Sequence, residues 1–138
     1  MAQSADTMPR PRTLLLGLAL VAAEIAAGVV GGMVATLRSA PPATGADTRP
    51  IAVVADVVIG AALLAIPLGV VRGRRRRRRW LEANILQAIL GVAGLVAVAY
   101  SHTVAAALAA LGWLTLTGAI LVLLFTGREY VRDVASQE

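Results

Sequence analysis

The sequence contains no cysteine, no lysine and only one histidine, His102, among its 138 residues. Without cysteine there are no disulfides, thiolate nucleophiles or cysteine-based metal sites, and one histidine cannot form a histidine cluster. We therefore expect no metal site and no cofactor. Ser101 precedes His102, but no orienting acid and no oxyanion loop accompany this pair. Because no common catalytic or nucleotide-binding motif occurs either, we do not expect an enzyme.

Apolar residues are what the chain has in excess. They make up 58% of it, whereas soluble domains contain about 45–50% by a comparable count. The excess is concentrated in blocks, and a soluble protein of this size has too little interior to bury so much apolar surface. The composition therefore indicates that lipid is the solvent for most of the chain.

Four continuous apolar stretches are each long enough to cross a bilayer, since about 20 helical residues span a hydrocarbon core of about 30 Å. They cover residues 13–37, 51–71, 81–100 and 103–125. They lack the alternation of barrel strands, and lipid allows only helices or closed barrels to span it. We predict an all-α polytopic membrane protein whose four transmembrane helices form two antiparallel hairpins. The predicted domains are a tail over 1–12, a transmembrane domain over 13–126 and a tail over 127–138.

The arginines predict the orientation of these helices. Only Arg38 and Arg49 lie on the side that holds the first and third connections, which leaves eleven of the thirteen arginines on the other side. Because positively charged residues favour the cytoplasmic side, we expect both termini in the cytoplasm of a bacterium and the helices in its inner membrane.

Seven of the arginines lie in VRGRRRRRRW, residues 71–80, and are Arg72, Arg74, Arg75, Arg76, Arg77, Arg78 and Arg79. We interpret residues 72–79 as the cytoplasmic turn of a hairpin, which Trp80 ends at the membrane interface. Anionic head groups lie within reach, and each arginine gains about 1 kcal/mol near them. Eight residues leave no room for a nucleic-acid domain, and charge alone gives only non-specific contact, so we expect no nucleic-acid partner.

Glu24 is the most informative single residue, because it lies near the middle of the stretch 13–37. An acidic side chain at that depth costs about 2.5–3.5 kcal/mol even on a lenient insertion scale. Glu24 must therefore face protein or water, or carry a proton. It shares its helix with small residues that allow another helix to approach closely, namely Gly17, Gly28, Gly31 and Gly32. Two roles stay open: an interhelical hydrogen bond, or a proton or cation site.

Asp56 and Gln87 are the other candidate members of this site. By residue counting, Glu24 lies about 16 Å and Asp56 about 22 Å from the cytoplasmic side, at about 1.5 Å per residue. These carboxyl groups lie on antiparallel neighbours and can approach each other, in which case like charges favour retention of a proton. Gln87 is a candidate for an interhelical hydrogen bond, worth about 0.6 kcal/mol on average in membranes.

Two family resemblances bear on these residues. The stretch LALVAAEIAAG, residues 18–28, resembles the first helix of small multidrug-resistance transporters, which implies proton-coupled export through Glu24. The aromatic residues that those transporters place in helices two and three are absent here. A broader set of features comprises Glu24, the arginine-rich loop ending in Arg79-Trp80, Gln87 and a basic tail. In these features most of the chain resembles an uncharacterised family of small actinobacterial four-helix membrane proteins, which implies the architecture and no mechanism.

From these observations we expect a small, non-enzymatic accessory or interaction subunit of the bacterial inner membrane. Its expected partners are anionic lipid head groups and either a copy of itself or a larger membrane protein, which it contacts through the first helix. The alternative is a small proton-coupled transporter that uses the carboxyl group of Glu24.

Overall fold

The computed structural model describes residues 11–40, 45–73 and 76–136, and within these ranges all regular structure is helical. Its helices are α1 (Arg12–Arg38), α2 (Arg49–Val71), α3 (Arg76–Ala99), α4 (Val104–Thr126) and α5 (Arg128–Ala135). The first four are long and apolar enough to cross a membrane. The all-α fold with four membrane-spanning helices is therefore confirmed. Some of the predictions from the sequence fall outside the described residues, namely those for residues 1–10, Arg74 and Arg75.

The start of α3 and the structure of the C-terminal tail differ from the prediction. Helix α3 already begins at Arg76 instead of residue 81, so Arg76 to Arg79 are helical and not part of the turn. Arginine is a good helix former. In the first two turns of α3, the Glu82 carboxylate also forms ion pairs with Arg78 and Arg79, at N–O distances of 2.9 and 2.8 Å. The polar tail also forms a separate helix, α5, after Gly127.

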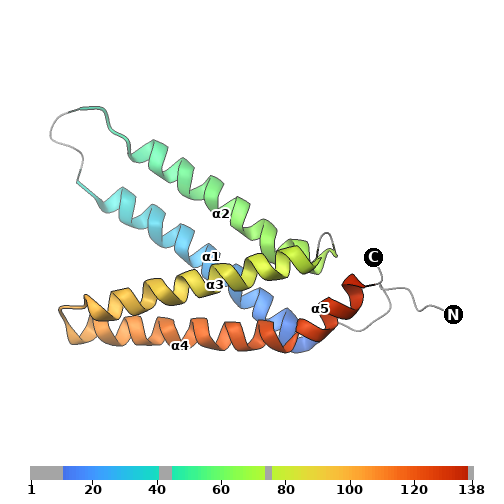
Figure 1. Ribbon diagram of the computed structural model, residues 1–138. Coiled ribbons are helices and arrows are strands. Elements are labelled where there is room, and N and C mark those ends of the chain that lie inside the picture. The colour runs from blue at the N-terminus through green and yellow to red at the C-terminus, as the bar shows by residue number, and fades with distance from the viewer. Residues whose placement is uncertain (1–10, 41–44, 74–75, 137–138) are drawn as a thin grey trace.

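The long helices form two antiparallel hairpins, α1–α2 and α3–α4, which together have the shape of a V (Figure 1). We call the closed end of the V the arginine end. It holds the starts of α1 and α3, the ends of α2 and α4, and all of α5. The open end holds the end of α1, the start of α2 and the connection between α3 and α4 over residues 100–103. Helix α1 contacts α4 and α2 contacts α3, and the two hairpins diverge toward the open end.

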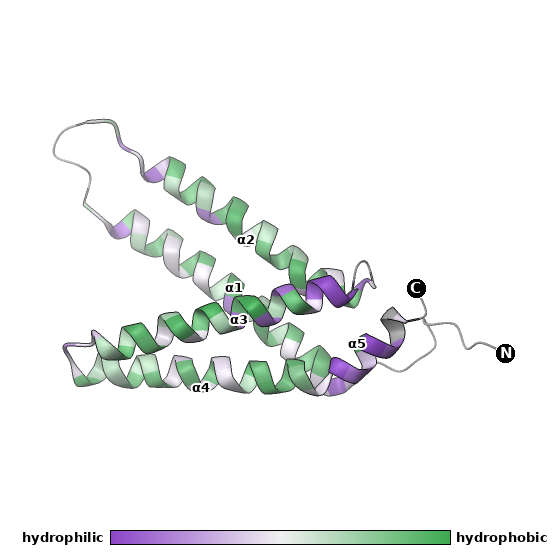
Figure 2. Cartoon of the chain, viewed as in Figure 1, coloured by the Kyte–Doolittle hydropathy of each residue, from purple (hydrophilic) through white to green (hydrophobic). Residues whose placement is uncertain are grey.

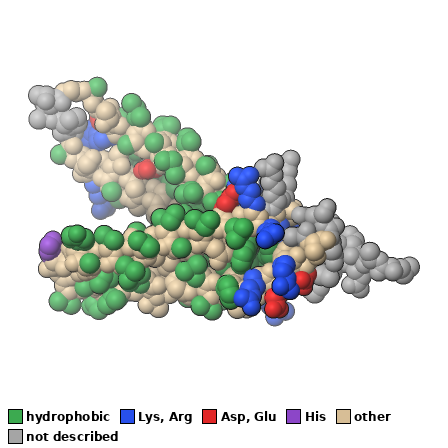
Figure 3. Space-filling model, in the orientation of Figure 1, with side chains coloured by type: hydrophobic (Ala, Val, Ile, Leu, Met, Phe, Trp, Pro, Cys, Tyr) green, Lys and Arg blue, Asp and Glu red, His purple; other side chains and the backbone are tan. Residues whose placement is uncertain are grey.

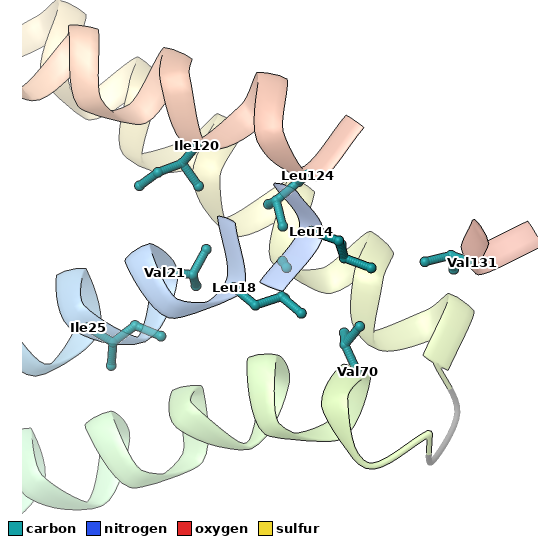
Figure 4. Close-up of a cluster of buried hydrophobic side chains, with 9 residues drawn as sticks. Leu14, Leu18, Val21, Ile25, Val70, Ile120, Leu124 and Val131 are labelled. Atoms are coloured by element: carbon teal, nitrogen blue, oxygen red, sulfur yellow. The ribbon is translucent and has the colours of Figure 1, made fainter. Parts of the chain in front are cut away.

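The buried core lies at the arginine end (Figure 4). Helix α1 contributes Leu14, Leu18, Val21 and Ile25, which recur at spacings of three and four residues and so share one face. This face packs against α4, where Gly17 lies so close to Leu123 and Leu124 that a methyl group on it would be 3.1 Å from the Leu123 Cβ. Beyond Ile25, α1 has no fully buried residue, which agrees with the divergence of the hairpins.

Polar side-chain contacts join the helices at the arginine end. The Trp80 indole N–H donates to the Leu124 carbonyl oxygen over 2.9 Å and so ties α3 to α4. Arg76 is buried, donates from Nε to the Val70 carbonyl oxygen at 3.4 Å, and places its guanidinium 5.6 Å from the Tyr130 ring centroid. The hydrophilic residues gather on the start of α3 and on α5 (Figure 2), whereas apolar side chains cover the hairpins (Figure 3).

Candidate functional site: an acidic cleft between the hairpins

A cleft of about 220 Å³ opens where the two hairpins begin to diverge. All four long helices contribute to its wall, which includes Glu24 and Gly28 of α1, Asp56 and Ile59 of α2, Leu90 of α3 and Trp113 of α4. The wall is mostly apolar, and none of the described residues that line it is basic. The cleft therefore presents two carboxyl groups in an apolar setting.

Glu24 and Gln87 meet at the base of the cleft. Gln87 has no exposed surface, Glu24 retains 7% of its surface, and the Gln87 Nε2–H donates to Glu24 Oε2 at a distance of 2.5 Å. Gln87 follows the buried Ala83 by one helical turn, and Glu24 lies between Val21 and Ile25 on the buried face of α1. The core registers of α1 and α3 thus bring together two residues that are 63 positions apart.

The other polar atom of each side chain, Glu24 Oε1 and Gln87 Oε1, is buried without a protein partner, as is Thr117 Oγ1 on α4. The Glu24 carboxyl group thus receives one hydrogen bond from the protein, and no basic side chain lines the described part of the cleft. Buried polar groups without partners are costly in an apolar interior. The arrangement therefore leaves acceptor capacity on Glu24 for a donor from outside the chain.

Asp56 occupies the same cleft from the other side. Its half-buried carboxyl group lies over Gly32, where a Cβ would be 2.9 Å from Asp56 Oδ2. The glycine of α1 thereby makes room for the acid of α2. The structure places Glu24 and Asp56 in one cleft, but the protein donor to Glu24 comes from α3.

The four glycines of α1 have different surroundings. Gly17 contacts α4 and Gly32 contacts Asp56, whereas Gly28 and Gly31 are exposed, with no neighbouring heavy atom within 4 Å of a Cβ position. Gly60 of α2 lies so close to Val29 of α1 that a Cβ on it would overlap Val29 Cγ2. Gly28 and Gly31 therefore leave space along α1 in this structure.

Gly60 lines the cleft, and Thr117 is buried on α4. The buried residues of α4 are Ala110, Thr117, Ile120 and Leu124. Their spacing of seven, three and four residues is typical of one packed helix face, and this signal was available in the sequence. A glycine between apolar residues, by contrast, does not reveal which neighbour approaches it.

The arginine run is divided by the fold. Arg76 is buried beside Tyr130, because α3 starts early enough to bring it against α5. Arg78 and Arg79 pair with Glu82, while Arg72 and Arg77 are exposed. Within the described residues, then, only part of the run is disposed for simple contact with a lipid surface.

Comparison of the chain with protein-family models, with curated proteins and with solved structures found no match. Within the described residues, no group of three histidine, aspartate and glutamate side chains could hold a metal ion.

Proposed function

We propose that this protein is a small, non-enzymatic interaction subunit of a bacterial inner membrane, and that its cleft receives a transmembrane helix of another membrane protein. The observation that carries the proposal is the acidic cleft itself. Carboxyl groups within a membrane are costly unless they face protein or water, yet Asp56 is only half-buried in a cleft that is open between the hairpins.

The surface around the carboxyl groups suits a helix. Gly28 lines the cleft and has open space above it, so that a second backbone can approach α1 closely. Close approach over small residues is the common basis of helix association in membranes, where lipid removes the hydrophobic drive. A helix in the cleft would also cover Ile59, which is 57% exposed.

Charge complementarity favours another protein over a second copy. The apolar stretches that form the spans carry no arginine, lysine or histidine in their interiors, so a second copy brings no positive charge to the depth of Asp56. A partner helix with a basic side chain at that depth would satisfy the carboxyl groups. We therefore commit to a different membrane protein as the occupant.

The orientation that we propose has both termini in the cytoplasm, in line with the excess of arginine on that side. The partner helix would then enter the cleft from the outer half of the membrane, because the V opens away from the arginine end.

A pair of glycine variants tests the cleft. Gly28→Leu adds a side chain to the cleft at a position where a Cβ meets no heavy atom within 4 Å, and Gly112→Leu adds the same side chain at an exposed α4 position that also has no neighbour within 4 Å of a Cβ. We expect Gly28→Leu to abolish co-purification of the partner in mild detergent, with the monomer still folded, and Gly112→Leu to retain it. Equal retention by both variants would contradict the proposal.

A proton-coupled transporter centred on Glu24 is the second candidate, because the Oε1 atoms of Glu24 and of its partner Gln87 are buried without a hydrogen-bond partner. Glu24→Gln separates the two functions. If the variant assembles normally but loses a proton-linked flux in vesicles, the transporter is supported. If it changes the assembly instead, the interaction subunit is supported.

A further inference from the structure

We infer that a second pocket, between α3 and α5 at the arginine end, binds a phosphate group carried either by a lipid head group or by a small soluble molecule. The pocket has a volume of about 440 Å³. Its wall includes Arg77, Trp80, Arg128, Glu129, Val131 and Arg132. The inference does not depend on the proposed function, because no residue of this pocket lines the acidic cleft.

The charge of the wall suits a phosphate. Three arginines and one acidic residue, Glu129, belong to the lining, which therefore has a net charge of two positive. Guanidinium groups bind phosphate oxygens through paired N–H donors, and arginine is preferred over lysine for this geometry. The three arginines come from two helices, so that a single phosphate can bridge α3 and α5.

The wall is held in place by contacts of its own. The Trp80 indole donates to the Leu124 carbonyl oxygen, and the Arg128 guanidinium lies 4.4 Å from the centroid of the Phe125 ring. Val131 is 2% exposed and anchors α5 against the bundle. Arg132 is 3.8 Å from Asp133, but at 81% side-chain exposure this pair is weak and leaves its donors accessible.

The other arginines of α3 are committed elsewhere, which makes this pocket distinct from the run as a whole. Arg76 is buried beside Tyr130, and Arg78 and Arg79 pair with Glu82. The pocket lies where α3 starts and α4 ends, the level at which head groups meet a spanning helix, and Trp80 is of the residue type that favours this level. Basic pockets beside transmembrane helices bind phospholipid head groups in this way.

The test uses the full chain in a maltoside detergent, which contains no phosphate. A short-chain phosphatidylglycerol and inorganic phosphate are titrated separately, with short-chain phosphatidylcholine as the zwitterionic control. Trp80 fluorescence reports binding in a Trp113→Phe background, because the chain has only these two tryptophans. Variants are Arg77→Gln, Arg128→Gln and Arg132→Gln. The matched control is Arg72→Gln, an exposed arginine of the same end that lies outside the pocket.

We expect each pocket variant to weaken binding about tenfold, the effect of a charge-assisted hydrogen bond, and Arg72→Gln to weaken it about fivefold at most, as a general surface arginine would. Binding of phosphatidylglycerol with this pattern supports a lipid source, and binding of inorganic phosphate with this pattern supports a soluble source. Equal loss in Arg72→Gln and the pocket variants would overturn the inference, since diffuse charge would then explain binding. If neither phosphatidylglycerol nor inorganic phosphate binds, the inference is also overturned.

Discussion

At the scale of single residues, the hydrogen bond between Gln87 and Glu24 is the main buried polar contact between α1 and α3. Both side chains are buried, and each keeps one oxygen without a protein partner. Removing one member of such a pair leaves the other unsatisfied, whereas removing both leaves an apolar contact. The pair can therefore be tested by a double-mutant cycle.

We predict that Gln87→Leu lowers the free energy of unfolding by about 1–3 kcal/mol, because Glu24 loses its donor. The double variant Glu24→Leu, Gln87→Leu should recover most of this loss. Unfolding by a denaturing detergent in mixed micelles measures both. A double variant that is no more stable than Gln87→Leu would show that the two residues are not coupled.

At the scale of helices, the tightest contact is between α1 and α2. Gly60 faces Val29 so closely that any side chain there must shift the Val29 side chain or the helices themselves. The neighbouring contact of Asp56 with Gly32 shows the same relation, in which a glycine of one helix receives a side chain of the other.

Gly60→Ala should therefore destabilise the protein by about 1–3 kcal/mol, the usual effect of overpacking. Gly112→Ala, at an open position of α4, should instead be neutral or stabilise by about 0.5–1 kcal/mol, because alanine favours a helix over glycine. Thermal unfolding in detergent compares the two. Adding Val29→Ala to Gly60→Ala should restore stability. Failure of this rescue would contradict the contact.

The start of α2 carries a contact that depends on pH. Hydrogen bonds from the Arg49 side chain and backbone N–H lower the pKa of Asp47 from 3.8 to about 2. Since the folded pKa lies below the ordinary value, the contact stabilises the folded state above about pH 3.8 and is lost as the pH falls through about 2. Amide exchange in the first turn of α2 should accelerate over that range in the wild-type protein. In Asp47→Asn the acceleration should be absent, and its persistence would assign it to another group.

The sequence predicts some levels of this structure better than others. The four spans follow from the length of the apolar stretches, and the antiparallel pairing follows from short connections. Glu24 and Gln87 were each candidates for a hydrogen bond, but their pairing depends on how α1 crosses α3, which no single helix encodes. The early start of α3 and the burial of Arg76 depend on contacts with α5, and the sequence of α3 alone does not contain them.

At the scale of the whole molecule, the proposed orientation makes a simple prediction. The chain has no cysteine, so single cysteines introduced at the exposed Ser39 and Ser136 report the two sides of the membrane without interference. We expect an impermeant thiol reagent to label Ser39→Cys in intact cells and Ser136→Cys only after permeabilisation. The reverse pattern would contradict the proposed orientation.

The V shape leaves an acidic cleft that a partner helix would cover, and cross-linking within native membranes tests this most directly. A short photoreactive probe is placed on Ile59→Cys, in the cleft, or on Val122→Cys, which is 64% exposed on α4 outside the cleft. We predict a discrete adduct with one other membrane protein from Ile59→Cys, which Gly28→Leu abolishes and Gly112→Leu retains. Adducts with lipid alone, adducts with a second copy of this chain, or the same protein adducts from Val122→Cys would contradict the account.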